Sequence, residues 1–587
     1  MSLIGAATFL TMLCLPFFIH YPMNDNYLQL YPISLGIGVV SVVACIFSFV
    51  KGNGFRFCLP DYLFLALVAY YIMRYDYTLQ LANWKVAFAL LSVPLWFGSR
   101  IILSHRSVSR QWILCSIVAV GCMVAVWGLL QLYGYLPSNH NLFAITGPFY
   151  NPGPYSGYIA IIFCIALGCW LQSKGFARYI WFAAIALMGC ILPAGMSRSA
   201  WVGIFASSLW MLTLHFQWHK RLKSFFKQHP YKGISAVVVL GISLCIGSYL
   251  IFQMKSDSAY GRLFIWKNTC TAISDAPLFG HGPGSFPMVY GKAQAEYFAK
   301  GDYTETEERV AGSPEYAFNE YLQFAIEGGI ILFIGTIIFG ICIFHNALKQ
   351  KEYRCLGALF AFAFFAFSSY PLQVLSIGIM IITVSAICVP QSRLYTTPLY
   401  RCVCRIAIGA SFILLMFIIK RLPNTSKVNE LWNNAYALYG CKDYRLSSQI
   451  YEEIYPQLCH HPFFVKNYGC SLFHEGRYRE ALEIFKRATL ISCEAEVYNW
   501  KGRCYQEMKD YESAERSYQY ALNLIPHRIY PYYMLAKLYA EPDFYNEEKS
   551  KEMITVVLNK PPKVHSKAID EMRNDVNSLL NDINKFN

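Results

Sequence analysis

Apolar segments follow one another along the first 420 residues, and a polar, helical tail comes after them. Runs such as Ile33 to Val50, Gln111 to Leu130 and Ile234 to Ile251 approach or reach the length that a helix needs to cross about 30 Å of hydrocarbon. About 12 to 13 such segments precede the tail. The pattern therefore predicts an all-α fold whose first part, residues 1–422, is a polytopic helical membrane domain.

Composition and charge agree with this class. The chain is 55% hydrophobic, 17% aromatic and only 15% charged, and lipid-facing surface tolerates few charges. The formal net charge of +14 comes from lysines and arginines spread over many short loops. A nucleic-acid-binding protein would gather them into one stripe, so we expect no nucleic-acid partner.

The distribution of Lys and Arg predicts an orientation in the membrane. Alternate short loops hold most of them, and the intervening loops hold little beyond Arg74, Lys85 and Arg198. The residues of the basic set are Lys51, Arg56, Arg100, Arg106, Arg110, Lys174, Arg178, Lys220, Arg221, Lys223, Lys227, Lys232, Lys349, Lys351, Arg354, Arg393, Arg401 and Arg405. Because cytoplasmic loops keep an excess of Lys and Arg, we expect this set and the amino terminus in the cytoplasm. The large loop, residues 255–321, is then outside. An even number of spans separates it from the tail, so the loop and the tail should meet on the outer face.

The tail, residues 424–587, repeats with a period of about 34 residues. Aromatic and small residues recur at fixed offsets: Tyr444, Tyr478 and Tyr511; Tyr451, Phe485 and Tyr518; Gly469 and Gly502; Ala481 and Ala514; Ala488 and Ala521. These residues resemble the tetratricopeptide repeat, in which small residues let paired helices approach and aromatic residues fill the gap. The resemblance implies an α-solenoid of three repeats and a degenerate fourth near Tyr532 to Leu558. Such arrays usually bind partners, so we expect a protein partner or an assembly surface.

Cysteine spacing favours no metal site. The 20 cysteines include no CxxC pair, and most lie in apolar segments, where a thiol behaves as a small apolar residue. We therefore expect no zinc site. We also expect no cofactor.

Four polar segments interrupt the pattern where a membrane fold places polar residues at a cost. They are "GPFYNPGPYSGY", with Asn151; "MSRSAWVG", with Arg198; "YGRLFIWKNTCTAISDAPLFGHGPGSF", with Arg262, Lys267 and His281; and "EYAFNEYLQFAIEGGI", with Glu315, Asn319, Glu320 and Glu327. A carboxylate inside a membrane helix, as expected for Glu327, is a functional hypothesis by default.

Each candidate also has a structural explanation. Arg198 could extend to the interface from a helix end, and Arg262 and Lys267 could belong to a solvated helix face. His281 could hydrogen-bond loop carbonyls, and Glu327 could pair with a neighbouring span. The glycines around His281 are expected to shape a turn, because the stretch is not the strand-to-helix setting of a nucleotide-binding loop.

In this order, the four segments resemble the O-antigen ligase and O-antigen polymerase superfamily of bacterial envelopes. The resemblance covers roughly Phe143 to Ile330 by motif: an Asn-containing turn, the pair Ser197 and Arg198, an Arg-led segment ending in a glycine turn, and Glu-x-Gly at the end. It implies transfer of a glycan from undecaprenyl pyrophosphate to an acceptor at the periplasmic face of the bacterial inner membrane, without a metal.

Several functions stay open at this point. The leading interpretation is O-antigen ligation to lipid A core. The alternatives are an O-antigen polymerase and an oligosaccharyltransferase that acts on protein serine or threonine. A transporter and a membrane scaffold are the non-enzymatic alternatives. The membrane half has no evident internal repeat and few ionisable groups at mid-span, which argues against a transporter, and a scaffold would have no need of Arg198 and Arg262.

The expected chemistry assigns roles to the candidates. Arg198 and Arg262, with Lys267, should bind the pyrophosphate, since guanidinium groups offer planar donor arrays to phosphate oxygens and keep their proton. Family members commonly have histidine before Asn, whereas this chain has Phe318. We therefore expect the base elsewhere, at His281, with Glu315 and Glu320 behind it. The supporting residues are Asn151, Asn319 and Glu327.

Overall fold

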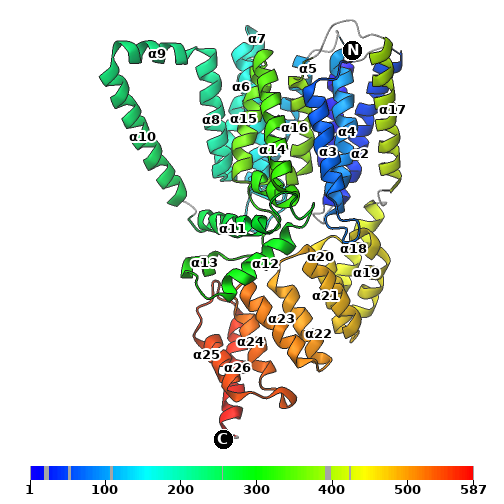
Figure 1. The fold of residues 1–587 in the computed structure, drawn as a ribbon, viewed down its shortest axis with the longest axis vertical. Coiled ribbons are helices and arrows are strands. Elements are labelled where there is room, and N and C mark those ends of the chain that lie inside the picture. Colours follow the sequence, from blue (N-terminus) through cyan, green and yellow to red (C-terminus); the bar gives the residue numbers. More distant parts are fainter. Residues whose placement is uncertain are drawn as a thin grey trace.

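The computed structural model describes residues 2–18, 26–50, 55–105, 110–253, 256–390, 398–421 and 425–585. Within these ranges every regular element is a helix and none is a strand. Figure 1 shows long, roughly parallel helices at one end of the molecule and an array of shorter helices at the other. The predicted all-α architecture, a helical membrane part followed by a repeat array, is confirmed.

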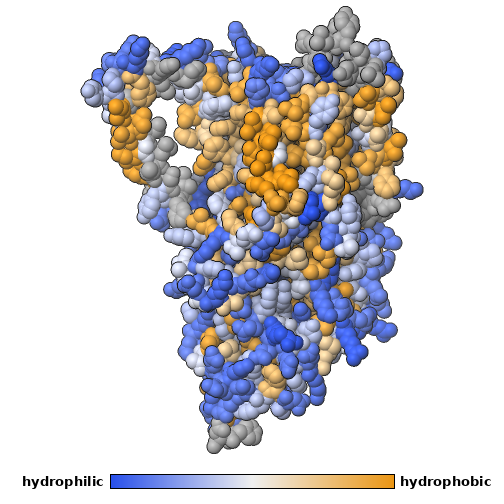
Figure 2. Space-filling model, viewed as in Figure 1, coloured by the Kyte–Doolittle hydropathy of each residue, from blue (hydrophilic) through white to orange (hydrophobic). Residues whose placement is uncertain are grey.

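The first part of the chain contains the apolar helices. Its elements are α1 (Ser2–Phe18), α2 (Asn26–Cys45), η1 (Ile46–Val50), α3 (Leu59–Met73), α4 (Asn83–Ser104), α5 (Arg110–Leu132), α6 (Pro152–Gln172), α7 (Phe176–Ile191), η2 (Pro193–Gly195), α8 (Arg198–His215), α9 (Trp218–Gln228), α10 (Pro230–Gln253), α14 (Glu320–Lys349), α15 (Tyr353–Phe367), η3 (Pro371–Gln373), α16 (Leu375–Cys388) and α17 (Pro398–Arg421). In the described residues, 6 candidate spans are long and apolar enough to cross a membrane, and shorter apolar helices accompany them. Figure 2 shows a hydrophobic belt over these helices, with hydrophilic surface above and below it.

A buried ion pair lies inside this helical layer. Arg100, expected in a basic loop, instead belongs to α4, where its Nε lies 3.1 Å from the Asp61 carboxylate and both side chains are fully buried. Trp96 Nε1 also donates to Asp61, at 2.9 Å. The expectation for Arg100 is therefore wrong, because apolar residues on both sides continue the helix and a buried carboxylate satisfies the charge. Of the other predicted loop residues, Lys51, Arg106, Lys255 and Arg393 lie outside the described residues.

The second layer joins the large loop and the tail. The loop forms α11 (Ser256–Asp275), α12 (Phe286–Ala299) and α13 (Glu305–Val310). The tail forms α18 (Thr425–Gly440), α19 (Tyr444–Leu458), α20 (Pro462–His474), α21 (Tyr478–Ile491), α22 (Ala495–Glu507), α23 (Tyr511–Leu524), α24 (Ile529–Leu538), η4 (Pro542–Phe544), α25 (Glu547–Asn559) and α26 (Lys567–Lys585). The predicted boundary between the two parts, residues 422–424, falls outside the described residues.

Helix pairs of the tail follow the predicted small-residue and aromatic positions. A methyl group placed at Gly469 of α20 would lie 2.7 Å from the Phe485 ring of α21, and one at Gly502 of α22 would collide with Tyr518 of α23. The glycines therefore let each pair approach closely enough to bury an aromatic ring. The expected fourth repeat, Tyr532 to Leu558, forms the pair α24 and α25.

The loop and the tail meet on one side of the membrane helices (Figure 1). Gln294 of α12 donates to the Leu524 carbonyl at 2.6 Å, and Ser313 donates to the Cys493 carbonyl at 3.0 Å. Lys560 forms an ion pair with Glu308 at 2.6 Å. The prediction that the two regions meet is confirmed by these contacts. That this side is periplasmic stays a prediction.

Candidate active site

The glycine turn of the loop packs against a break in α14. Gly329 has a φ of 68°, which interrupts the helix. The turn supplies hydrogen bonds in place of the interrupted ones: His281 N donates to the Ile326 carbonyl and Gly282 N to the Glu327 carbonyl, both at 2.8 Å. Gly280 also has positive φ, and a Cβ there would lie 2.5 Å from Gly329 N. Glycine is needed on both sides because the two backbones are in contact.

Glu327 is buried at this junction and is fully engaged. It forms an ion pair with Lys85 of α4, accepts from Tyr71 and Gln323 at 2.8 Å each, and accepts from Gly284 N at 3.2 Å. A buried charge requires such partners. Glu327 therefore connects α3, α4, α14 and the glycine turn, as its structural explanation predicts.

The neighbouring polar residues of α14 also support the framework. Glu320 accepts from Leu372 N at 2.6 Å and from Gln373 Nε2 at 3.1 Å, which ties the start of α14 to the α15–α16 connection. Asn319 is the N-cap of α14, where its side chain accepts from two backbone N–H groups. Capping of this kind satisfies donors that the first turn of a helix leaves without partners.

His281 and Lys267 make contacts typical of structural residues. The His281 Nε2 lies 2.8 Å from the Ala272 carbonyl. Lys267 lies 2.7 Å from Glu307 and 2.8 Å from the Tyr297 hydroxyl. Burial alone would raise the pKa of Glu307, but hydrogen bonds from Lys267 and the Thr304 backbone N–H lower it to about 2. Both residues thus brace the loop through interactions within it.

Arg198 and Arg262 come together from separate segments. Arg198 is the first residue of α8, and Arg262 lies in the first half of α11. Burial lowers the pKa of the Arg262 guanidinium, and the nearby positive charge of Arg198 lowers it further. Desolvation and a like charge both disfavour a cation, and two neighbouring guanidinium groups present donors of the kind that bind phosphate oxygens.

An aromatic cluster lies beside the arginine pair. The Arg262 guanidinium is 5.8 Å from the Phe318 ring centroid. Phe318 has a φ of 50° and packs edge-on against Tyr370 at 5.1 Å, while Tyr316 stacks on Tyr370 at 5.3 Å. Trp266 of α11 donates to the Ala317 carbonyl at 3.1 Å, which holds this segment against the loop.

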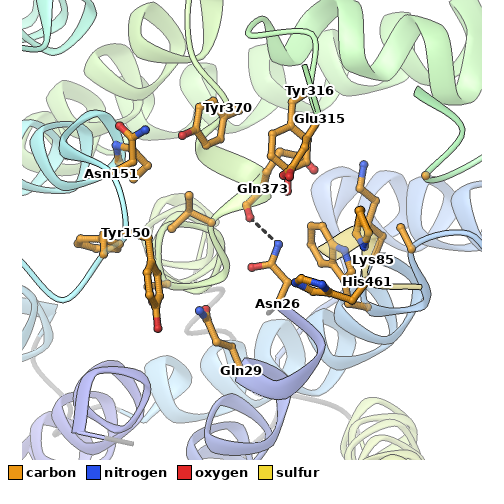
Figure 3. Close-up of a pocket in the computed structure, with 18 of the residues that line it drawn as sticks. Asn26, Gln29, Lys85, Tyr150, Asn151, Glu315, Tyr316, Tyr370, Gln373 and His461 are labelled. Atoms are coloured by element: carbon orange, nitrogen blue, oxygen red, sulfur yellow. Dashed lines mark hydrogen bonds between the residues drawn. The ribbon is translucent and has the colours of Figure 1, made fainter. Parts of the chain in front are cut away.

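Tyr370 connects the arginine pair to a polar cavity of about 500 Å³. Burial and the nearby Glu315 carboxylate raise the pKa of Tyr370 to about 12, and the positive charge of Arg262 acts in the opposite direction. Both Tyr370 and Glu315 line the cavity, as does Asn151, the N-cap of α6. Figure 3 shows amide, carboxylate, imidazole and aromatic side chains facing this space.

A second, largely apolar cavity of about 760 Å³ lies among α3, α4, α14, α15 and α16. Its walls include Phe64, Leu67, Phe88 and Phe324. The side chains shared with the polar cavity are Trp84, Lys85 and Gln373. The apolar cavity therefore borders the polar cavity at these three residues.

The structure divides the predicted site residues into three groups. Glu315 and Asn151 line the polar cavity, and Arg198 and Arg262 form a pair beside its aromatic wall. The others take part in framework contacts: His281, Lys267, Asn319, Glu320 and Glu327. Sequence reasoning missed Lys85, Tyr370, Gln373 and His461. The sequence did single out Lys85, because it is one of the few basic residues in the short segments that were expected outside the cytoplasm.

Within the parts of the chain that the structure describes, no three His, Cys, Asp or Glu side chains come together in the manner of metal ligands.

Comparison with known proteins finds relatives for two parts of the chain. Residues 183–337 match a family described as O-antigen ligase. In the tail, residues 430–490 match YpiA-like, C-terminal tetratricopeptide repeats, and residues 495–528 match the tetratricopeptide repeat. An O-antigen ligase of Pseudomonas aeruginosa is 23% identical over 194 residues, which cover 33% of this chain and 45% of that protein. The chain thus spans less than half the length of that relative.

Among solved structures, MamA from Desulfovibrio magneticus RS-1 is 18% identical, with a TM-score of 0.21 over 26% of this chain and 86% of MamA. A MamA double mutant gives the same identity and TM-score over 30% of this chain and 92% of its own. The earlier resemblance is thus confirmed by the family matches and the curated relative. The chain is a polytopic membrane protein with an O-antigen ligase family domain and C-terminal tetratricopeptide repeats.

Proposed function

We propose that this protein transfers a glycan from undecaprenyl pyrophosphate to an acceptor at the periplasmic face of the inner membrane. Lipid A core is the leading acceptor, which makes the reaction O-antigen ligation. The family match over residues 183–337 supports this class of chemistry. The observation that carries the proposal is that Arg198 and Arg262 lie near enough for their charges to interact, because two neighbouring guanidinium groups can bind the oxygens of one pyrophosphate.

The two arginines act on the leaving group. As the glycosidic bond breaks, negative charge grows on the pyrophosphate. Guanidinium groups present donors that match phosphate oxygens and keep their charge in a partly desolvated site. Interactions aimed at charge that develops in the transition state contribute most to the rate. Arg198 and Arg262 are therefore the catalytic residues of the proposed clamp, and Lys267, paired with Glu307, is left out of it.

The apolar cavity supports a place for the polyprenyl tail. Most of the residues that line this cavity are apolar, and they belong to helices of the hydrophobic belt. Lys85, Trp84 and Gln373 mark its border with the polar cavity. A lipid-linked sugar has the same division into an apolar chain and a polar head, so the tail would occupy one cavity and the sugar the other.

Glu315 is the best-placed candidate for the base. It lines the polar cavity, whereas His281 contacts a backbone carbonyl and Glu320 is held by two donors. A general base must reach the proton that it removes. In the proposed step the acceptor oxygen attacks the anomeric carbon with inversion, its proton passes to the Glu315 carboxylate, and the bond to the phosphate oxygen breaks. Undecaprenyl pyrophosphate leaves with the electron pair.

Gene deletion and complementation test this proposal. The deletion strain is complemented with wild type, Arg198→Ala, Arg262→Ala and the matched control Lys267→Ala, and lipopolysaccharide ladders and glycoprotein stains are compared. Ligation predicts loss of long-chain lipopolysaccharide, with polymer accumulating on the lipid carrier, restored by wild type and Lys267→Ala only. Equal restoration by every variant would support the scaffold alternative.

The same gels separate the other reactions. A ladder reduced to a single repeat unit on lipid A core would indicate a polymerase. Lost staining of glycoproteins with normal lipopolysaccharide would indicate an oligosaccharyltransferase. Tetratricopeptide repeats lie beside the site, and such repeats commonly bind proteins. The glycoprotein stain therefore tests whether the acceptor is a protein.

A further inference from the structure

The repeat domain forms one wall of the polar cavity. His460, His461 and Pro462 at the α19–α20 corner line it together with Ile491 at the end of α21. The other walls belong to the membrane helices and to the loop before α14. Figure 3 shows His461 near Lys85 and Asn26, on the side of the cavity opposite Asn151 and Tyr150. The cavity is thus completed by a domain whose family resemblance predicts partner binding alone.

Arg487 fixes this corner against the membrane domain. Its Nε donates to the Cys459 carbonyl at 3.1 Å, directly before His460. The same guanidinium donates to the carbonyls of Leu79 and Gln80 in the connection between α3 and α4, at 3.3 Å for Gln80. Arg487 therefore connects two walls of the cavity. One wall comes from the repeat domain, and the other comes from the start of α4.

Apolar packing strengthens the same junction. Leu28 of α2 and Leu81, which precedes α4, belong to one buried cluster with Trp432 and Phe464 of the repeat domain. Burial of such side chains removes apolar surface from water and so stabilises the contact. The position of the α19–α20 corner relative to the cavity is therefore set by packing as well as by Arg487.

His461 is held in one orientation. It is the N-cap of α20, where its Nδ1 accepts from Phe464 N at 3.3 Å. Its ring packs edge-on against Trp432, with centroids 4.7 Å apart. When Nδ1 accepts, the proton of a neutral imidazole resides on Nε2. These contacts hold the His461 ring in one orientation, with Nε2 on the ring edge away from its own helix.

The composition of the cavity wall suits a saccharide. Planar amides and aromatic rings both line it: Asn26, Gln29, Asn151, Gln373, Trp84, Tyr150, Tyr316 and Tyr370. Amides donate and accept hydrogen bonds to hydroxyl groups, and aromatic rings offer apolar faces with polar edges. A ligand with many hydroxyl groups on an apolar ring frame has the complementary chemistry.

We propose that the α19–α20 corner of the repeat domain is part of a saccharide-binding site, and that His461 helps to select the saccharide. This inference rests on the proposed function, because it names the part of the molecule that recognises one of its two glycan substrates. The saccharide belongs either to the lipid-linked donor or to the acceptor, which present the same hydroxyl chemistry.

The test replaces the imidazole but keeps the helix cap. His461→Asn retains a preferred N-cap residue and removes the ring that faces the cavity. Asp510→Asn is the matched control, since Asp510 caps α23 and lies outside the cavity lining. Initial rates of the full-length protein in proteoliposomes are measured while lipid-linked glycan and core lipopolysaccharide, both extracted from the deletion strain, are varied in turn.

The expected result is a rise in KM for one of these substrates of roughly 3- to 10-fold in His461→Asn, the effect of one lost hydrogen bond, with the control unchanged. The substrate whose KM rises identifies the source of the saccharide. Arg487→Met, which frees the corner, should raise the same KM and leave the other unchanged.

Unchanged KM values for both substrates in His461→Asn and Arg487→Met, with Arg198→Ala and Arg262→Ala inactive, would overturn the inference and leave the proposed function standing. Full activity of both arginine-to-alanine variants would overturn the proposed function instead. Thermal unfolding of each variant confirms that a changed KM belongs to a folded protein.

Discussion

Two arginines of this chain, the fully buried Arg100 and the partly buried Arg262, have different electrostatic surroundings. Arg100 lies inside the helical layer with the Asp61 carboxylate 3.1 Å away, and neither side chain is exposed. Arg262 is partly buried, which lowers the pKa of its guanidinium, and the like charge of the nearby Arg198 lowers that pKa further. A cation that is paired with a buried carboxylate serves the structure, whereas two neighbouring guanidinium groups can bind the oxygens of one pyrophosphate.

The largest expected effect concerns the internal pair. Asp61→Asn leaves Arg100 buried with its charge uncompensated, and breaking a buried pair costs about 3–5 kcal/mol of the free energy of unfolding. Thermal unfolding in detergent checks this. The double variant Asp61→Leu with Arg100→Met should recover most of the loss, because apolar replacement of a whole buried pair is often neutral. Equal stability of Asp61→Asn and wild type would contradict the structural role.

Replacing Arg262 should change the transfer rate and leave the stability of the fold unchanged. Arg262→Ala is expected to lower the transfer rate by about 10² to 10³-fold, the effect of losing one preorganised donor, with the unfolding temperature near that of wild type. Arg262→Lys keeps the charge but loses the planar donor array. Its transfer rate should therefore lie between those of wild type and Arg262→Ala. A lysine variant as active as wild type would mean that charge alone suffices.

Packing in the repeat domain extends the comparison to uncharged residues. Gly469→Ala places a methyl group 2.7 Å from the Phe485 ring, and overpacking of this kind costs about 1–3 kcal/mol. Gly440→Ala is the control, because nothing lies within 4 Å of a Cβ at that position. Denaturant unfolding should show destabilisation in the first variant only. Equal effects of both would remove the packing explanation.

The smallest effect is expected at Lys267, the third cation first assigned to the pyrophosphate. Its ion pair with Glu307 is solvent-exposed, so it contributes at most about 1 kcal/mol. Because the pKa of Glu307 is lowered to about 2 in the folded protein, this contribution is present above the ordinary carboxylate pKa of about 4.3. It is lost as the pH falls from about 4.3 toward 2.

Unfolding of wild type and Lys267→Ala at pH 7 and near pH 2 measures this contribution. The transfer rate at pH 7 should differ less than twofold, in contrast to Arg262→Ala. A 10²-fold loss of rate would return Lys267 to the clamp.

Residues with a periodic or sequential pattern were predictable from the sequence. Gly469 and Gly502 recur with their aromatic partners, and the helix pairs follow. Arg198 and Arg262 were found because each interrupts an apolar pattern in a recognisable order, and the structure places them together. Glu327 was identified as a buried carboxylate, and it has a structural counter-ion.

Contacts between distant segments were not predictable. Lys85 and Glu327 are far apart in the chain, and only the packing of α4 against α14 makes them an ion pair. Arg100 looked like a loop residue because its partner, Asp61, lies in another helix. His461 reaches the cavity only because the repeat domain docks against the loop and the membrane helices, which no local pattern encodes.

The most direct measurement of the central claim is a double-variant cycle on the arginine pair. Transfer rates in proteoliposomes are compared for wild type, Arg198→Ala, Arg262→Ala and the double variant. If both residues bind one pyrophosphate, each single variant should lose about 10² to 10³-fold. The double variant should then be little slower than either, since residues that act as a unit have non-additive effects. Single variants within twofold of wild type, in folded protein, would contradict the claim that the pair forms the active site.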